Sequence, residues 1–285
     1  MPAPYPHSSI VNRPPLTFPD GKRVAFYIGL NVEVFDADLP VVAGGPVPDP
    51  QAYGWRDYGN RVGFWRLVDV LDDAGVPVSV ILNSEAARAF PEIVDAGVER
   101  GWAWVAHGRT NSVYLSGMDG AKEAAHLDAV FADLDAALLS RPTGWLGPGL
   151  AATAATPHLL AERGVRYVLD WCCDDQPFAM DVPGLWSVPY SLELNDLNLF
   201  LPGPGPSGPD YERLVLDQFE QLLADSATTG RVLALPLHTF IAGQPHRAKY
   251  VARVIRQIAA TPEVWVCTSD DVAAHARQAA HGPAP

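Results

Sequence analysis

Residues 60–82 read NRVGFWRLVDVLDDAGVPVSVIL, and this stretch contains one complete helix-to-strand unit. Apolar residues at 62, 65, 67, 68, 70 and 71 recur at the spacing of an amphipathic helix. Gly75 is a natural stop, because glycine readily takes the left-handed conformation that ends a helix. The run from Val76 to Leu82 is then typical of a buried strand. The stretch therefore predicts a helix over residues 60–74 that feeds a strand of a parallel sheet.

The same alternation continues on both sides of this unit. Arg23 to Glu33 (RVAFYIGLNVE) is rich in strand-forming residues and precedes a Pro/Gly-rich loop over 37–59. Asn83 or Ser84 begins a helix that runs to about Arg100 and stops at Gly101. The other predicted strands lie at 102–106, near Trp145, and at 167–171, 185–190, 232–237 and 264–268. The other predicted helices lie at 119–140, 211–225 and 247–260, with one more at the carboxyl terminus.

This order of elements predicts the fold class. Seven or eight strand–helix alternations without a Gly-rich dinucleotide fingerprint favour a parallel α/β barrel over a doubly wound sheet. We expect a single barrel domain over residues 21–285. Residues 1–20 contain six prolines and are expected to form an extended arm on the surface or on a partner subunit, which suggests a homo-oligomer. The sequence PGPGPSGP at 202–209 is expected to be a loop on the active face or a tolerated insertion.

Composition restricts the class of partner. The net charge of −13 provides no basic surface for nucleic acid, and an acidic membrane surface would repel the chain. A small neutral or cationic molecule fits this charge better. The three cysteines include an adjacent pair, and this odd count is typical of a reducing compartment. With no apolar signal segment near the amino terminus, the chain is expected to be cytoplasmic.

Polar residues follow several of the predicted strands. In a parallel barrel the carboxyl ends of the strands carry the chemistry, so these residues are candidates for one site. They are Asn31, Glu33, His107, Asn111, Asp174, Asp175, the run Glu193 to Asp196, and His238. Other catalytic patterns are missing from the sequence: it has no G-x-S-x-G elbow, no phosphate-binding loop and no zinc-type cysteine spacing.

The residue types at these strand ends suit hydrolysis. Glu33 is expected to have a raised pKa in an apolar barrel mouth and to act as a general base on water. His107 and His238 could share in water activation, in metal binding, or in protonating a leaving nitrogen. The amides of Asn31 and Asn111 could hold a water or an oxyanion. Asp175 and Asn195 could hydrogen-bond the substrate, and aromatic residues such as Trp171 could line a pocket for a planar ring.

Structural roles remain open for the same residues. Either histidine could be a hydrogen-bonded core group, and most of the aromatic side chains could belong to the core. Glu33 could pair with an arginine such as Arg56 or Arg61, and the Asp174–Asp175 pair could cap the turn at Pro177.

Five longer stretches resemble a known family. They are YGNRVGFWRLVDVLDDAGVPVSVILNSE, GWLGPGL, DWCCDDQP, VPYSLELND and LHTFIAGQPHR. Over about residues 20–275 the chain resembles the polysaccharide deacetylase-like family, whose fold is a distorted (β/α)7 barrel. Within it, the stretches are similar to proteins grouped with the metal-independent allantoinase and bacterial cyclic imide hydrolases. The resemblance implies a leaving-group role for His238.

The sequence departs from the metal-dependent deacetylases of that family. They carry two aspartates at the first strand end, where this chain has Asn31 and Glu33. They also carry a His-x3-His pair, which is His107 and Asn111 here, and an arginine before the proline segment, which is missing from Trp145–Pro148. Zinc usually takes three protein ligands in a catalytic site, and a carboxamide oxygen is a poor one. We therefore favour no cofactor, although a weak divalent metal such as zinc on Glu33, His107 and Asn111 remains an alternative.

The sequence as a whole predicts a hydrolase that cleaves a non-peptide carbon–nitrogen bond in a small cyclic amide, imide or ureide. The alternatives are a metal-dependent N-deacetylase of an amino sugar or oligosaccharide, and a ring-binding protein without turnover.

Overall fold

The centre of the molecule is one curled sheet, seen in a computed structural model that describes residues 3–40, 44–201 and 205–281. In these residues the sheet has nine strands in the order β6-β7-β5-β4-β3-β2-β1-β8, with β9 also paired to β1. Neighbouring strands are parallel except for β6 and β7. The predicted distorted α/β barrel is confirmed, and its curl stays open between the β6–β7 edge and β8.

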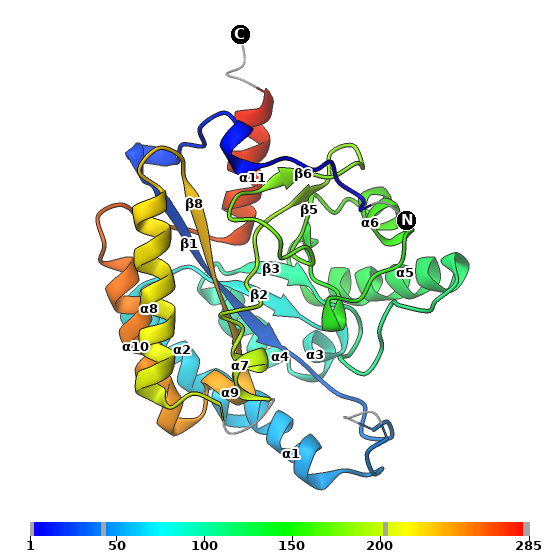
Figure 1. Ribbon diagram of the computed structural model, residues 1–285. Coiled ribbons are helices and arrows are strands. Elements are labelled where there is room, and N and C mark those ends of the chain that lie inside the picture. Colours follow the sequence, from blue (N-terminus) through cyan, green and yellow to red (C-terminus); the bar gives the residue numbers. More distant parts are fainter. Residues whose placement is uncertain (1–2, 41–43, 202–204, 282–285) are drawn as a thin grey trace.

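Two long strands cross the middle of the molecule side by side, β1 (Val24–Val32) and β8 (Arg231–His238) (Figure 1). Every residue of both strands is buried, which explains their continuous apolar sequence. The remaining strands are β2 (Ser79–Leu82), β3 (Ala103–Ala106), β4 (Gly144–Trp145), β5 (Tyr167–Val168), β6 (Phe178–Ala179), β7 (Trp186–Ser187) and β9 (Val264–Val266).

Helices α2, α8 and α10 cover one side of β1 and β8, and α1, α7 and α9 lie at the end toward which these strands point (Figure 1). The helices of the described residues are α1 (Pro50–Tyr58), α2 (Phe64–Ala74), α3 (Ser84–Ala89), α4 (Pro91–Glu99), α5 (Gly120–Ala137), α6 (Thr156–Glu162), α7 (Asp196–Phe200), α8 (Gly208–Asp225), α9 (Thr239–Ala242), α10 (Pro245–Ala259) and α11 (Ser269–His281). None of these helices combines the length and the apolar character that a membrane span requires.

Two helical predictions were wrong in detail. The predicted loop 37–59 contains α1, which Asp49 caps by accepting the Ala52 N–H at 2.9 Å, with Pro50 at the first helical position. The single helix predicted over 83–100 is divided into α3 and α4. Pro91 begins the second helix, because proline has no N–H for a continuous helical bond.

The proline-rich arm lies against the barrel at the end opposite α1 (Figure 1). The Pro4 carbonyl accepts the Asp181 N–H at 2.8 Å, and Arg13 forms an ion pair with Asp174 at 2.5 Å. The amino-terminal segment therefore covers the sheet of its own chain. Of the Pro/Gly stretch at 202–209, residues 202–204 lie outside the described residues, and Gly208 already begins α8.

Candidate active site

Three of the residues singled out by their strand-end positions meet in one buried cluster. Glu33 directly follows β1, His107 directly follows β3, and His238 is the last residue of β8. The Glu33 Oε1 atom lies 3.2 Å from His107 Nε2 and 3.4 Å from His238 Nε2. No more than 5% of any of the three residues is exposed. The carboxyl ends of the strands thus bring together one carboxylate and two imidazoles from distant parts of the chain.

The backbone fixes the orientation of the His107 ring. Its Nδ1 atom lies 2.7 Å from the Leu146 carbonyl oxygen. A carbonyl only accepts hydrogen bonds, so Nδ1 carries the proton and donates it to Leu146. The Nε2 atom of the same ring lies 3.2 Å from Glu33 Oε1, within hydrogen-bond distance. A ring that carries protons on both nitrogens donates to the Leu146 carbonyl and to the Glu33 carboxylate.

A second carboxylate fixes the His238 ring. Asp196 Oδ1 accepts from His238 Nδ1 at 2.7 Å, and Asp196 Oδ2 accepts the His238 backbone N–H at 2.8 Å. Burial would lower the pKa of His238, but the nearby charges of Glu33 and Asp196 raise it to about 10. His238 is therefore an imidazolium near neutral pH, with its Nε2–H directed at Glu33.

The expected pKa of Glu33 was wrong, and the expected arginine partner is only partly excluded. Its pKa was expected to be raised, and burial does act in that direction, but His238 and His107 outweigh burial and hold the pKa below its usual range. Of the two arginines considered as structural partners, Arg61 pairs with Asp57 instead, whereas the charge of Arg56 does interact with Glu33 without a direct ion pair to it among the described contacts. Glu33 is accordingly ionised, as a base must be.

The cluster opens into a cavity of about 290 Å³. Of the predicted substrate-binding residues, Asn31, Asn111 and Asn195 line it together with Leu146, Leu150, Tyr190 and Leu192. The Asn31 amide nitrogen donates to the Tyr190 hydroxyl at 3.0 Å, and Asn195 Oδ1 accepts the Leu197 N–H at 2.9 Å to cap α7. The Asn111 Oδ1 atom accepts from Asn83 at 3.1 Å, which leaves the Asn111 amide nitrogen as a donor for the cavity.

The structure does not bring Asp175 and Trp171 to this cavity. The Asp175 carbonyl accepts the Val232 N–H at 2.8 Å near the amino end of β8, the opposite end of the strand from His238. Trp171 packs against Tyr5 of the arm, with ring centroids 5.2 Å apart. The reason is that β5 is only two residues long and the chain after it turns back along the open edge of the sheet. A larger groove of about 550 Å³ runs there, lined by Asp174, Asp175 and Arg13.

Two residues had no assigned role in the sequence analysis. Asp196 belonged to the polar run 193–196, but only its contacts with His238 reveal its function. Asp170 is the acid nearest the end of β5, and its Oδ1 atom accepts the Gly147 N–H at 2.8 Å. Burial raises the pKa of Asp170 to about 6. Its position immediately after the apolar run 167–169 was the available signal.

The predicted metal-ligand set does not fit a tightly held ion. Among the described residues, no three histidine, cysteine or acidic side chains are grouped to hold a metal. Of the set Glu33, His107 and Asn111, Asn111 offers only a carboxamide oxygen, a poor zinc ligand that also accepts from Asn83. This leaves two strong ligands, whereas a catalytic zinc site usually has three.

Comparisons with known proteins give a consistent picture. No protein-family model matches the chain. A crystal structure from Pseudomonas aeruginosa PAO1, provisionally assigned as a polysaccharide deacetylase, is 27% identical, with a TM-score of 0.84 over 95% of this chain and 97% of the other. The crystal structure of PuuE allantoinase is 26% identical, with the same TM-score and the same coverage of both chains. A Schizosaccharomyces pombe protein with the same provisional deacetylase assignment is 24% identical over 89% of this chain and 85% of its own length.

Proposed function

We propose that this chain, a polysaccharide deacetylase-like protein in sequence and fold, hydrolyses a carbon–nitrogen bond in a small cyclic amide, imide or ureide. The observation that carries the proposal is the position of Glu33 Oε1, which lies within 3.4 Å of the Nε2 atoms of both His107 and His238 in the lining of the substrate cavity. The similarity to an allantoinase, over 95% of the chain, supports a ureide or a related ring as the substrate class.

The first step is attack by water. A water that donates to Glu33 Oε1 from the substrate cavity, with His107 beside it, has its own lone pairs free to face the substrate. Glu33 accepts one water proton while the oxygen forms a bond to the ring carbonyl carbon. The Asn111 amide nitrogen donates to the oxyanion that develops, while its amide oxygen accepts from Asn83.

The second step is expulsion of the ring nitrogen. The imidazolium of His238 donates its Nε2 proton to that nitrogen as the carbon–nitrogen bond breaks. Glu33 Oε1 lies 3.4 Å from the same Nε2, so the proton taken from water can return to His238. Each turnover then consumes one water and restores both residues, and Asp196 holds the His238 ring throughout.

The cavity indicates a small substrate. Its volume of about 290 Å³ is at the lower end of the range for small-molecule sites, roughly 300–1,000 Å³. Leu146, Leu150 and Tyr190 offer apolar faces for a flat ring, and Asn31, Asn111 and Asn195 offer amides for its polar edge. The donor set supports chemistry without a tightly held metal.

The test is an assay of the purified protein on succinimide, hydantoin, allantoin and N-acetylglucosamine, with metal analysis and with activity measured before and after chelation. We expect ring opening that resists chelation and that falls at least about 10²-fold in Glu33→Gln, the smallest contribution typical of a general base. Release of acetate from N-acetylglucosamine that chelation abolishes would favour the metal-dependent deacetylase instead. Full ring-opening activity in Glu33→Gln would exclude the mechanism.

A further inference from the structure

A second, much smaller cavity lies on another side of Glu33. Its volume is about 30 Å³, and its lining includes Glu33, Phe35, Tyr53, Arg56 and Asn60. We call it the back pocket. It lies between the end of β1, helix α1 and the π-helical turn Gly59–Gly63, whereas the substrate cavity is lined by the two histidines. Glu33 is the only residue that lines both cavities in the described part of the chain.

Three residues of the back pocket carry a buried polar atom without a hydrogen-bond partner among the described residues. These atoms are Glu33 Oε2, Arg56 Nε and Asn60 Oδ1. Buried polar atoms in folded proteins are nearly always paired with protein or with ordered water. Three such atoms around one cavity therefore call for a common explanation.

The geometry determines which of these atoms donate and which accept. Asn60 Nδ2 donates to the Glu33 backbone carbonyl at 2.7 Å, so its amide oxygen must be the atom left unpaired. Arg56 Nε–H can only donate, and Glu33 Oε2 in its ionised form can only accept. A water molecule can accept one hydrogen bond and donate two, which matches one donor and two acceptors.

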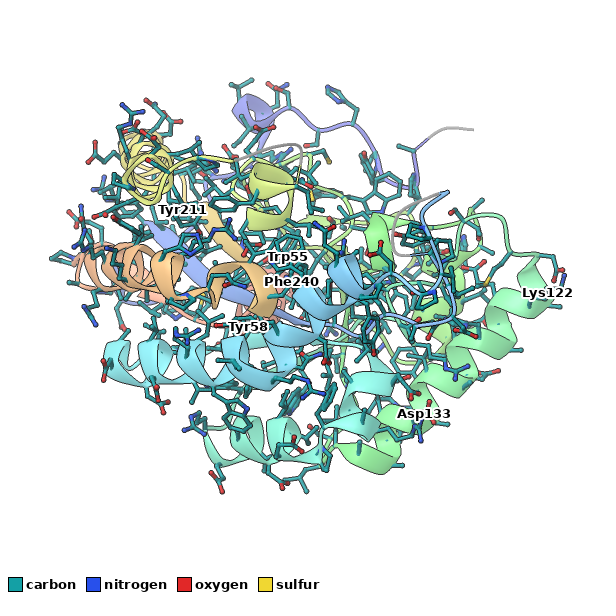
Figure 2. The ribbon with its side chains drawn as sticks, turned by 90° about the horizontal axis from the view of Figure 1, so that it is seen from below. Trp55, Tyr58, Lys122, Asp133, Tyr211 and Phe240 are labelled. Carbon is teal, nitrogen blue, oxygen red and sulfur yellow. The ribbon has the colours of Figure 1, made fainter. Side chains whose placement is uncertain are left out.

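The Arg56 side chain is held by aromatic rings. Its guanidinium carbon lies 4.8 Å from the centre of the Phe35 ring and 5.6 Å from that of Phe240. Figure 2 shows Trp55 of α1 close to Phe240 of α9, and their ring centroids are 5.0 Å apart. The Arg56 Nη1 atom donates to the Ala52 carbonyl at 3.1 Å. These contacts place a cation beside Glu33, and the charges of Glu33 and Asp49 act on Arg56 in turn.

We propose that the back pocket binds one ordered water that bridges Glu33 Oε2, Arg56 Nε and Asn60 Oδ1, and that Arg56 is a positioning residue for Glu33. A cavity needs roughly 10–15 Å³ for a water, so about 30 Å³ is sufficient. The two carboxylate oxygens then have different tasks. Oε2 is anchored at the back, and Oε1 stays turned toward the imidazoles and the substrate cavity.

The water itself is independent of the activity, whereas the positioning role rests on the proposed function, in which Glu33 is the base. A crystal structure of the unaltered protein at a resolution that shows ordered water tests the site directly. We expect one full-occupancy peak within hydrogen-bond distance of all three atoms. A direct Glu33–Arg56 ion pair, or a back pocket without a water peak, would overturn the proposal even if ring opening is observed.

Kinetics of Arg56→Met and Arg56→Lys test the positioning role. Loss of a group that orients a catalytic residue typically costs about 10- to 100-fold in activity. We expect kcat of Arg56→Met to fall by this factor with KM within about twofold of the original, and the Lys variant, which keeps a charge and a donor, to recover part of the loss. Arg88→Met is the matched control, because Arg88 is exposed and pairs with Glu85 on its own helix. A rise in KM without loss of kcat would show that Arg56 binds substrate instead, and the proposal would fail.

Discussion

Replacing Asp196 by asparagine tests how much the Asp196 carboxylate contributes to holding and charging the His238 imidazole. The carboxylate accepts two hydrogen bonds from His238, at Nδ1 (2.7 Å) and at the backbone N–H (2.8 Å). An amide of the same shape offers only one accepting oxygen, so its NH₂ group must face one of these two donors. The variant therefore loses one buried hydrogen bond to a charged group, worth about 1.5–3 kcal/mol, and also the negative charge beside the imidazolium.

The expected effect on stability depends on pH. His238 has a folded pKa of about 10 against an ordinary value of 6.5, so it stabilises the fold fully below pH 6.5. That stabilisation is lost as the pH rises through about 10. The original protein should therefore become less stable between these two pH values, and Asp196→Asn should show a weaker dependence there. At pH 6.5 we expect the variant to unfold roughly 3–12 °C lower, from about 2–4 °C per kcal/mol in large domains.

The expected effect on activity is a fall in kcat of about 10²-fold, the lower part of the range for general acid catalysis, because the imidazole remains but is less basic and less firmly held. Thermal unfolding followed by circular dichroism from pH 6 to 10, with steady-state kinetics, measures both effects. Asp217→Asn, an exposed acid on α8, is the control. A variant with unchanged kcat and an unchanged pH dependence of unfolding would refute the role of Asp196.

Two further variants test the geometry around the site. Asp175→Asn should keep kcat/KM within about twofold, because Asp175 lies near the amino end of β8 beside Arg231; a tenfold loss in the ring-opening assay would contradict this placement. Gly63→Ala should lower the free energy of unfolding by about 1–3 kcal/mol, as overpacking does, because the added Cβ would lie 2.1 Å from the Thr239 carbonyl oxygen of α9. Denaturant unfolding measures this change. Gly54→Ala is the control, because a Cβ added there has no heavy atom within 4 Å.

The sequence predicted the parts of the fold in which a long apolar run ends in a polar residue. Glu33, His107 and His238 each follow or end such a run, and the parallel register that pairs Asn31 with His238 brings the strand ends together. The strands β4 to β7 are two residues long, too short for a periodic pattern to locate their ends. For this reason Asp175 was predicted to lie at the end of β5, although the strand ends several residues earlier. Asp170, the acid that does follow the strand end, was not predicted as a site residue.

The contacts that set the protonation states of the site residues could not be predicted from the sequence. The pKa of Glu33 is lowered rather than raised because two imidazoles lie within 3.4 Å of it, and this depends on the ends of three separate strands. The same holds for Asp196, whose partner is 42 residues away in the chain, and for Asn60, which reaches Glu33 from a π-helical turn. Local sequence patterns predict which residues lie at the strand ends. The protonation states of these residues depend on the side chains from distant parts of the chain that surround them.

The charges of the cluster agree with catalysis by its own side chains. Glu33 and Asp196 contribute two negative charges, and the His238 imidazolium contributes one positive charge. Arg56, beside Glu33 but in another cavity, supplies a second positive charge, so the four groups are neutral in sum. A buried carboxylate is tolerated only when it is paired and hydrogen-bonded: Glu33 Oε1 has the two histidines, and Oε2 has the water that we propose for the back pocket. The same arrangement leaves His238 protonated before each turnover and Glu33 ionised, which are the two states that proton donation to nitrogen and proton removal from water require.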